Sequence, residues 1–147
     1  MRKRAFSPPT LPRPWGNYAH AVRVAGGATV YVAGQVGWDR EGRMTSRELR
    51  GQIEQAFANV AAALEVAGAA LADVVKVNAY MVDITQFPVY SEVRNRPFPA
   101  PDFPASTVIE VKSLAKPGWL IEIEAIAVVP ERRPRPRLRR RPRERRA

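Results

Sequence analysis

Residues 119–129 constrain the fold more than any other stretch, because they alternate in the manner of a long β-strand. One face of this strand is apolar, and the other is half apolar and half acidic. The first face comprises Ile121, Ile123, Ala125, Ala127 and Val129, and the second comprises Leu120, Glu122, Glu124, Ile126 and Val128. We expect helices to cover the first face. If the second face were open to water, its apolar residues would be exposed as one patch. We therefore expect another copy of the chain to bury this face.

Four other segments have the composition or alternation of strands, and two have the apolar periodicity of helices. The predicted strands cover residues 20–24, 29–34, 74–82 and 106–111, and the predicted helices cover residues 49–67 and 87–95. Gly26 and Gly27 form a tight turn, which predicts that the first two strands pair as a hairpin, and residues 39–42 form another turn. With two helices on one face of a mixed sheet, this order predicts a two-layer α+β domain.

The charge of the chain is concentrated at its C-terminal end. Residues 131–147 contain ten Arg and two Glu, a net charge of +8 out of the +10 of the whole chain. Because this segment is almost all Arg and Pro, we expect a disordered tail. Such a tail could bind nucleic-acid phosphates nonspecifically, but it lacks interleaved aromatic residues. A solvated appendage without a specific role is the alternative.

The rest of the chain divides into a short arm and one domain. Residues 1–14 are basic and rich in Pro, which predicts a flexible arm, and residues 15–130 suit a single domain. The absence of cysteine excludes disulfides, thiolate nucleophiles and cysteine-ligated metals. No apolar run approaches the roughly 20 residues of a membrane helix, and the N-terminus lacks the apolar stretch of a signal peptide. We therefore expect a cytoplasmic protein without a membrane partner.

Five short motifs, in order along the chain, resemble those of the RidA/YjgF family, once called the L-PSP endoribonuclease family. The family patterns are G-P-Y-x-x-A, V-F-V-S-G-Q, Q-A-x-x-N-V, A-G with D-V-V-K, and I-E-I-E-A-I-A. They stand here as GNYAHA at 16–21, VYVAGQ at 30–35, QAFANV at 55–60, AG at 67–68 with DVVK at 73–76, and IEIEAIA at 121–127. Each motif is weak alone, but the ordered set covers about residues 14–130.

This resemblance implies a chorismate-mutase-like fold and a homotrimer whose sheets form a central barrel, with sites in the clefts between subunits. It also implies hydrolysis of reactive enamines and imines to 2-keto acids and ammonia, without a cofactor. The family's catalytic carboxylate corresponds to Glu122, which would hold and deprotonate the attacking water. The alternative is a polar interface residue, although burying a carboxylate in a half-apolar strand is costly. We expect Glu124 to be structural or a salt-bridge partner.

Three further positions are implied to contact the substrate. Tyr18 matches the tyrosine whose ring walls the family's pocket, Gly34 lets a backbone amide approach a ligand, and Ser91 falls where some members have Asn. The alternatives are an ordinary packed aromatic, a strand end that needs no Cβ, and a surface serine. His20 is the only histidine, so a Ser-His-Asp system or a histidine metal site has little support, and we predict no metal.

The main departure from the family lies at Ser106. Deaminating members carry P-A-R-S/T where this chain has PAST at 104–107, and their Arg binds the substrate carboxylate through two parallel hydrogen bonds. Thr107 keeps the Ser/Thr position and is implied to contact the substrate, but the Ser106 hydroxyl supplies no charge. Losing such a contact typically costs a few kcal/mol, enough to lower turnover of 2-imino acids by a factor of roughly hundreds.

Three interpretations of Ser106 follow. Another cation replaces the Arg, with Arg13, Arg94 and Arg96 as candidates, although each is expected to be an exposed surface charge. Alternatively, the substrate lacks a carboxylate, or the domain binds a small molecule without turning it over. The sequence therefore predicts an imine or enamine deaminase with altered substrate, and a non-catalytic small-molecule-binding protein is the alternative. RNA binding or cleavage, suggested by the family's older name, lacks the catalytic histidine pair that would support it.

Overall fold

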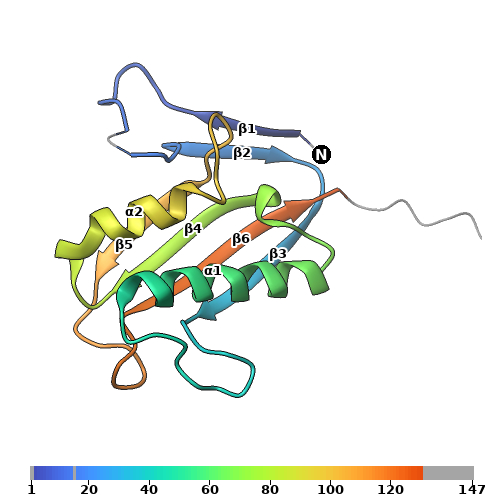
Figure 1. Cartoon of the computed structure of the whole chain (residues 1–147). Helices are drawn as coiled ribbons and strands as arrows, with labels where there is room; N and C mark the ends of the chain where they lie inside the picture. The colour runs from blue at the N-terminus through green and yellow to red at the C-terminus, as the bar shows by residue number, and fades with distance from the viewer. Residues whose placement is uncertain (1, 15, 131–147) are drawn as a thin grey trace, which may run out of the picture.

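The computed structural model describes residues 2–14 and 16–130, so the predicted basic tail lies outside the described residues. A four-stranded sheet contains β3 (Ala28–Gln35), β6 (Ile121–Val129), β4 (Val74–Met81) and β5 (Ala105–Glu110), in that spatial order (Figure 1). β6 is antiparallel to both of its neighbours, whereas β4 and β5 are parallel, so the sheet is mixed. The strand that the alternation predicted is thus a central strand.

Two helices, α1 (Leu49–Val66) and α2 (Phe87–Asn95), lie on the same face of this sheet (Figure 1). Two short 3-10 helices, η1 (Leu71–Asp73) and η2 (Ile84–Gln86), precede β4 and α2. These bounds agree with the predicted helices and strands to within two residues. The predicted two-layer α+β domain is therefore confirmed.

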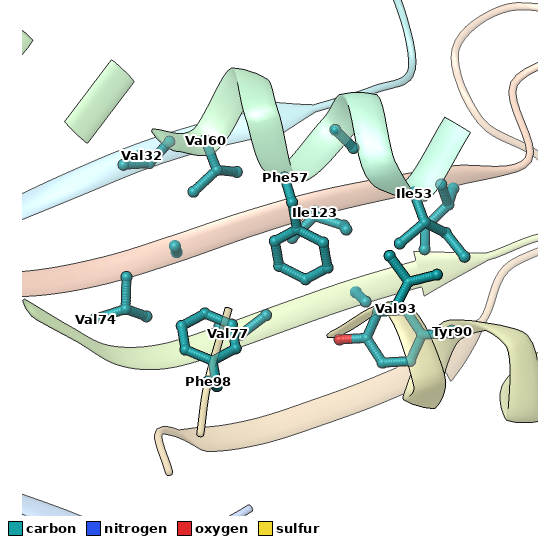
Figure 2. Close-up of a cluster of buried hydrophobic side chains, with 14 of the residues drawn as sticks. Val32, Ile53, Phe57, Val60, Val74, Val77, Tyr90, Val93, Phe98 and Ile123 are labelled. Atoms are coloured by element: carbon teal, nitrogen blue, oxygen red, sulfur yellow. The ribbon is translucent and has the colours of Figure 1, made fainter. Parts of the chain in front are cut away.

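The core lies between the helices and the sheet (Figure 2). Ile121 and Ile123 of β6 are fully buried, and an apolar stripe of α1 packs in the same cluster. This stripe consists of Ile53, Phe57, Val60 and Leu64. Because burying each large apolar side chain stabilises the fold by roughly 1.5–3 kcal/mol, a one-residue slip of β6 is strongly disfavoured. The core thereby fixes Glu122 on the opposite face of the sheet.

The first predicted strands pair differently from the expectation. β2 (Ala21–Ala25) does not form a hairpin with β3 but pairs antiparallel with β1 (Arg2–Phe6) in a separate two-stranded sheet. Gly26 and Gly27 do make a tight link with positive φ, yet β3 pairs with β6 instead. The prolines of residues 1–14 predict a flexible arm, whereas Arg2–Phe6 forms the strand β1. All of them follow Phe6, so Arg2–Phe6 keeps every backbone N–H for pairing.

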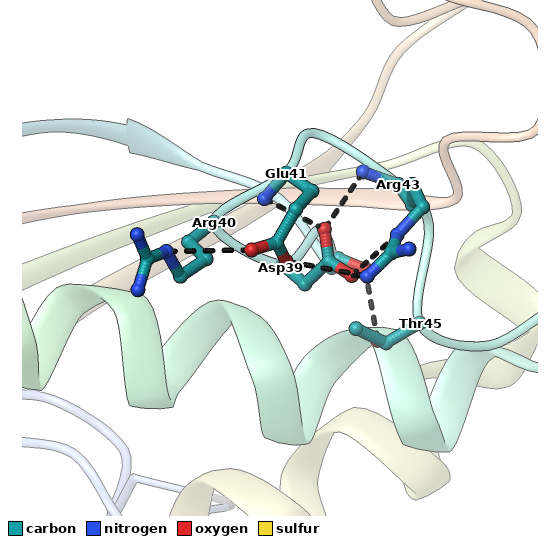
Figure 3. Close-up of polar contacts among 6 residues, drawn as sticks. Asp39, Arg40, Glu41, Arg43 and Thr45 are labelled. Atoms are coloured by element: carbon teal, nitrogen blue, oxygen red, sulfur yellow. Dashed lines mark hydrogen bonds and ion pairs between the residues drawn. The ribbon is translucent and has the colours of Figure 1, made fainter.

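The predicted turn at 39–42 connects β3 to α1 and is organised by one carboxylate (Figure 3). Asp39 Oδ1 accepts hydrogen bonds from the backbone N–H groups of Glu41, at 3.0 Å, and Arg43, at 2.9 Å. Asp39 Oδ2 pairs with the Arg43 guanidinium at 2.9 Å. The backbone hydrogen bond from Arg43 is the main cause that lowers the pKa of Asp39. The turn is therefore held by bonds among its own residues.

Gln52 is a fully buried polar side chain on α1. Its Nε2 donates to the carbonyl oxygens of Ser46, at 3.0 Å, and Gly118, at 2.9 Å. Its Oε1 accepts a hydrogen bond from the backbone N–H of Leu120, at 2.9 Å. These bonds attach α1 to the loop from which β6 begins, so Gln52 helps to position the start of the strand that carries Glu122.

Substituting Gln52→Leu is expected to lower the free energy of unfolding by about 2–4 kcal/mol, because Leu keeps the volume but removes three buried hydrogen bonds. Urea denaturation followed by tryptophan fluorescence measures the change. Gln55→Leu on the same helix is the control, since Gln55 donates only to Asn59. Equal losses in the two variants would show that the bonds of Gln52 have no special weight.

Candidate functional site

A pocket of about 600 Å³ lies between α2, β5 and the segment that precedes β2. Four of the six predicted site residues line it, although they are far apart in sequence. They are Tyr18, Ser91, Ser106 and Thr107. The other two, Gly34 and Glu122, do not line this pocket. The structure therefore divides the predicted site into two groups.

One wall of the pocket is a single face of α2. Phe87, Tyr90, Ser91 and Arg94 line the pocket and follow one another at helical spacing. Tyr90 lies beside Val93 in the buried cluster and is 1% exposed (Figure 2). Arg94 is 4% exposed. A helix that also packs on the core thus holds this wall in place.

The opposite wall comes from the chain before β2. The backbone N–H of Ala19 donates to the carbonyl oxygen of Pro104 at 3.2 Å, and Ala19 forms a parallel bridge with Ala105. This docking brings Tyr18 against the start of β5. The Tyr18 ring meets the ring of His20 edge-on, with 5.8 Å between centroids. Tyr18 is thereby placed at the pocket wall.

The guanidinium of Arg94 is only partly satisfied. Its Nη1 donates to the carbonyl oxygen of Asn17 and to Oδ1 of Asn95, the latter at 3.4 Å. Its Nε and Nη2 are buried without a hydrogen-bond partner in the described part of the chain. Burial lowers the pKa of Arg94, because the surrounding protein solvates the charge less well than water does.

Tyr90 carries a second unsatisfied group beside Arg94. Burial raises the pKa of Tyr90 to about 12, and the Arg94 charge and the Ser106 hydroxyl act against this rise. Neither neighbour forms a hydrogen bond of normal geometry with the Tyr90 oxygen. Arg94, Tyr90 and His20 together hold all the unpaired buried side-chain polar atoms of the described residues. Such atoms are rare in folded proteins, and two of these three residues, Tyr90 and Arg94, line the pocket, which indicates a ligand site there.

The second group lies on the face of the sheet away from the helices. Glu122 pairs in register with Tyr80 of β4, and its side chain extends over Gly34 of β3. A Cβ at Gly34 would lie only 2.7 Å from the carboxyl carbon and 2.9 Å from Cγ of Glu122. The register of β3 against β6 shifts between Val32 and Gln35, where Gly34 stands. Glycine is needed here because the carboxylate occupies the space of a side chain.

The two carboxylates of β6 differ in their partners. Glu124 Oε1 accepts hydrogen bonds from Asn78, at 2.7 Å, and from the Tyr80 hydroxyl, at 3.0 Å. The bond to Glu124 is the main cause that raises the pKa of Tyr80, and the Glu122 charge adds a smaller effect. Within residues 2–14 and 16–130, no side chain or backbone group donates a hydrogen bond to the Glu122 carboxylate. Glu124 is thus structural, as expected, and Glu122 is free to bind a ligand or water.

Glu122 and Ser106 lie on opposite faces of the sheet. Ser106 is paired across the strands with Val77, which is in turn paired with Ala125, so the three residues form one cross-strand row. Val77 and Ala125 are both buried under the helices. Glu122 stands in a row with Tyr80 and Ile109 on the other face. Tyr31, 78% exposed, and Ile109 are large apolar side chains left open on that face. Within one chain, Glu122 and the Ser106 side of the pocket therefore face away from each other.

Among the candidate cations, the structure separates Arg94 from the other two. Arg13 is exposed, and Arg96 is paired with Glu54 and Glu92 at 3.0 and 3.1 Å. The expectation that Arg94 is an exposed surface charge is wrong. Its position seven residues after Phe87, on the same helical face as Tyr90 and Ser91, is the signal that would have placed it in the pocket.

Sequence reasoning also missed Lys76 on β4. Its Nζ donates to Oγ1 of Thr107 at 2.6 Å, and burial lowers its pKa. It belongs to the D-V-V-K motif but carried no role in the prediction.

In the described part of the chain, no helix is long and apolar enough to cross a membrane.

Comparison with known proteins agrees with this architecture. The family model described as Endoribonuclease L-PSP matches residues 9–129. A 2-iminobutanoate/2-iminopropanoate deaminase of Dermatophagoides farinae is 40% identical over 128 residues, which are 86% of this chain and 97% of that protein. A RutC family protein of Pyrococcus abyssi is 38% identical over 128 residues, 86% of this chain and 98% of that protein.

A solved structure gives the same result at the level of the fold. The YyfB protein of Yersinia pestis, described as a protein of unknown function of the conserved Rid family, superimposes with a TM-score of 0.81 and 34% identity. The match covers 88% of this chain and 100% of that one. Because the family model, the relatives and the structure all span the domain, the chain belongs to the RidA/YjgF family, whose model bears the name Endoribonuclease L-PSP.

Proposed function

We propose that this protein hydrolyses reactive imines at a site formed between two copies of the chain. The observation that carries the proposal is the free carboxylate of Glu122, held over Gly34 on the sheet face opposite the pocket. A neighbouring copy that covers the exposed apolar face would bring its own pocket to this carboxylate. The name of the Dermatophagoides farinae relative supports a 2-imino acid as substrate.

In the proposed reaction, Glu122 acts first as a general base. It takes a proton from water while the water oxygen attacks the imine carbon and the electron pair of the C=N bond moves to nitrogen. Because the imine nitrogen enters protonated, this addition gives a neutral carbinolamine. The carboxylic acid of Glu122 then returns its proton to the amine nitrogen, the regenerated carboxylate takes the hydroxyl proton as the C–N bond breaks to give the carbonyl product, and the ammonia leaves with that proton as ammonium. The steps consume one water and use no cofactor.

The test is an assay of the full-length protein with 2-iminobutanoate generated in situ by an amino acid oxidase. Semicarbazide traps the imine, so a deaminase lowers the yield of trapped product and raises that of 2-oxobutanoate. Heat-unfolded protein is the control. A trapped fraction equal to that with buffer alone would remove the proposal for this substrate and favour the non-catalytic ligand-binding alternative. A parallel incubation with single-stranded RNA tests the older ribonuclease name.

Gly34→Ala is expected to lower kcat by about 10–100-fold, because the new methyl group displaces the general base from its place. Gly26→Ala is a matched control: its added Cβ meets no atom within 4 Å, although its positive φ costs some stability. Both variants are compared in the trapping assay after their melting temperatures have been recorded. A Gly34→Ala enzyme with wild-type kcat would show that the position of Glu122 over Gly34 is unimportant.

A further inference from the structure

Arg94 is a buried cation without an acidic partner. It is 4% exposed, and none of the ion pairs among the described residues includes it. A guanidinium stays protonated in proteins, so the charge persists even in this environment. A buried charge that lacks an opposite charge is costly, and proteins retain such groups mainly where a ligand completes them. The pocket that Arg94 lines is therefore suited to an anion.

The free atoms of Arg94 specify the shape of that anion. Nη1 already donates to the carbonyl oxygen of Asn17, and the Phe98 ring covers one guanidinium face with 5.7 Å from its centroid to Cζ. Nε and Nη2 remain, and their N–H bonds point from the same edge of the planar group. Two parallel donors on one edge match the two oxygens of a carboxylate. In the isolated chain both atoms are covered by protein, so the carboxylate would take the place of the covering groups.

The position of Arg94 relative to Ser106 is the second observation. Both residues line the pocket, and both lie close enough to the Tyr90 hydroxyl to influence its ionisation. Ser106 marks the position at which deaminating members of the family carry Arg. Serine is small and leaves room beside β5, and Arg94 brings its positive charge to the same pocket from α2.

We infer that Arg94 binds the carboxylate of the substrate, so that α2 supplies the charge that β5 lacks at Ser106. The inference rests on the proposed function for the identity of the substrate as a small 2-imino acid. Of the three interpretations of Ser106, it selects replacement by another cation. It also excludes imines without a carboxylate as the preferred substrates.

Lys76 is the competing cation. Its Nζ donates to Thr107, which also lines the pocket, but Lys76 itself does not line it. It stands two residues before Asn78 on β4 and on the same sheet face, and its hydrogen bond to Thr107 engages one of its three donors. A lysine also offers a point charge rather than a paired edge. Lys76→Met therefore serves as the variant that separates the two assignments.

The first test needs no substitution. Titration calorimetry of the wild-type protein compares 2-oxobutanoate, the expected product, with 2-oxobutanamide, which has the same shape without the charge. The carboxylate is expected to bind at least about 30-fold more tightly, as for a desolvated charge pair. Equal affinities would overturn the inference whatever the enzymatic activity is.

The second test uses variants of the full chain in the trapping assay. Arg94→Met is expected to lower kcat/KM for 2-iminobutanoate by about 100-fold or more, since Met keeps the packing volume and removes both donors. Arg96→Gln and Lys76→Met are expected to stay within a few-fold of wild type. A large loss in Lys76→Met with none in Arg94→Met would assign the carboxylate to Lys76 and overturn the inference.

Moving the arginine from α2 back to β5 tests for rescue of activity. Arg94→Met combined with Ser106→Arg is expected to recover at least about 10-fold of the lost kcat/KM, because the family arrangement is restored. If Arg94→Met fails to fold, the double variant Arg94→Lys with Ser106→Arg and the calorimetric comparison still decide the question. Tight, Arg94-dependent binding of 2-oxobutanoate without turnover would sustain the inference and reject the proposed hydrolysis. Turnover that Arg94→Met leaves unchanged would reject the inference and sustain the proposed hydrolysis.

Discussion

Glu122→Gln is expected to lower kcat for 2-iminobutanoate hydrolysis by about 10²–10⁴-fold, the usual contribution of a positioned general base. Glutamine has the shape of glutamate and fits over Gly34, but its amide cannot take a proton from water. Substrate binding is expected to change little, because Glu122 does not line the pocket and, in the proposed site, the pocket belongs to the neighbouring copy. The trapping assay measures kcat, and calorimetry with 2-oxobutanoate measures binding.

Glu124→Gln is the matched control for this prediction. It makes the same chemical change two residues further along the same strand and on the same face. Its oxygen can still accept the hydrogen bonds of Asn78 and Tyr80, so activity is expected to stay within about tenfold of wild type. Equal losses in the two variants would indicate that the negative charge of this face matters rather than a base at Glu122. No loss in either would reject Glu122 as the base.

The fold could be predicted from the sequence where periodicity and burial agree. The alternation of β6 and the stripe of α1 each place one apolar face in the core, and the structure confirms both. The pairing of β2 could not be predicted in this way. A tight Gly26-Gly27 link is compatible with a hairpin, but partner choice depends on a ladder with Arg2–Phe6, whose sequence has no strong apolar signal.

The site could be predicted only as far as the family motifs and the strand alternation reach. They named Tyr18, Ser106 and Glu122, and the structure divides these between a pocket and the opposite sheet face. The local sequence around Arg94 is polar, so it resembles a solvated helix surface. Its burial arises because residues 16–19 dock on β5 and close the pocket over α2, a long-range contact that no local pattern records.

This division of the site leads to the prediction that two inactive variants restore each other. Glu122→Gln leaves the pocket intact, and Ser91→Trp fills the pocket while leaving Glu122 intact. In a closed ring of mixed subunits, each site takes Glu122 from one subunit and the pocket from its neighbour. In a trimeric ring that contains both variants, one of the three sites receives both intact parts, so assemblies purified for the presence of both variants are expected to regain about one third of wild-type activity.

Mixed assemblies are prepared by co-expression with two different affinity tags, purified through both tags, and assayed beside each variant alone. Ser91→Trp mixed with a second pocket variant, Thr107→Trp, is the control, because every site of that mixture has a blocked pocket and no activity should return. Light scattering establishes the number of subunits. A mixture of Glu122→Gln and Ser91→Trp that stays as inactive as its components, despite verified exchange, would place the whole site within one chain. Glu122 and Ser106 argue against that outcome. Residues paired side by side across neighbouring strands share a sheet face, and Glu122 and Ser106 belong to pairings on opposite faces.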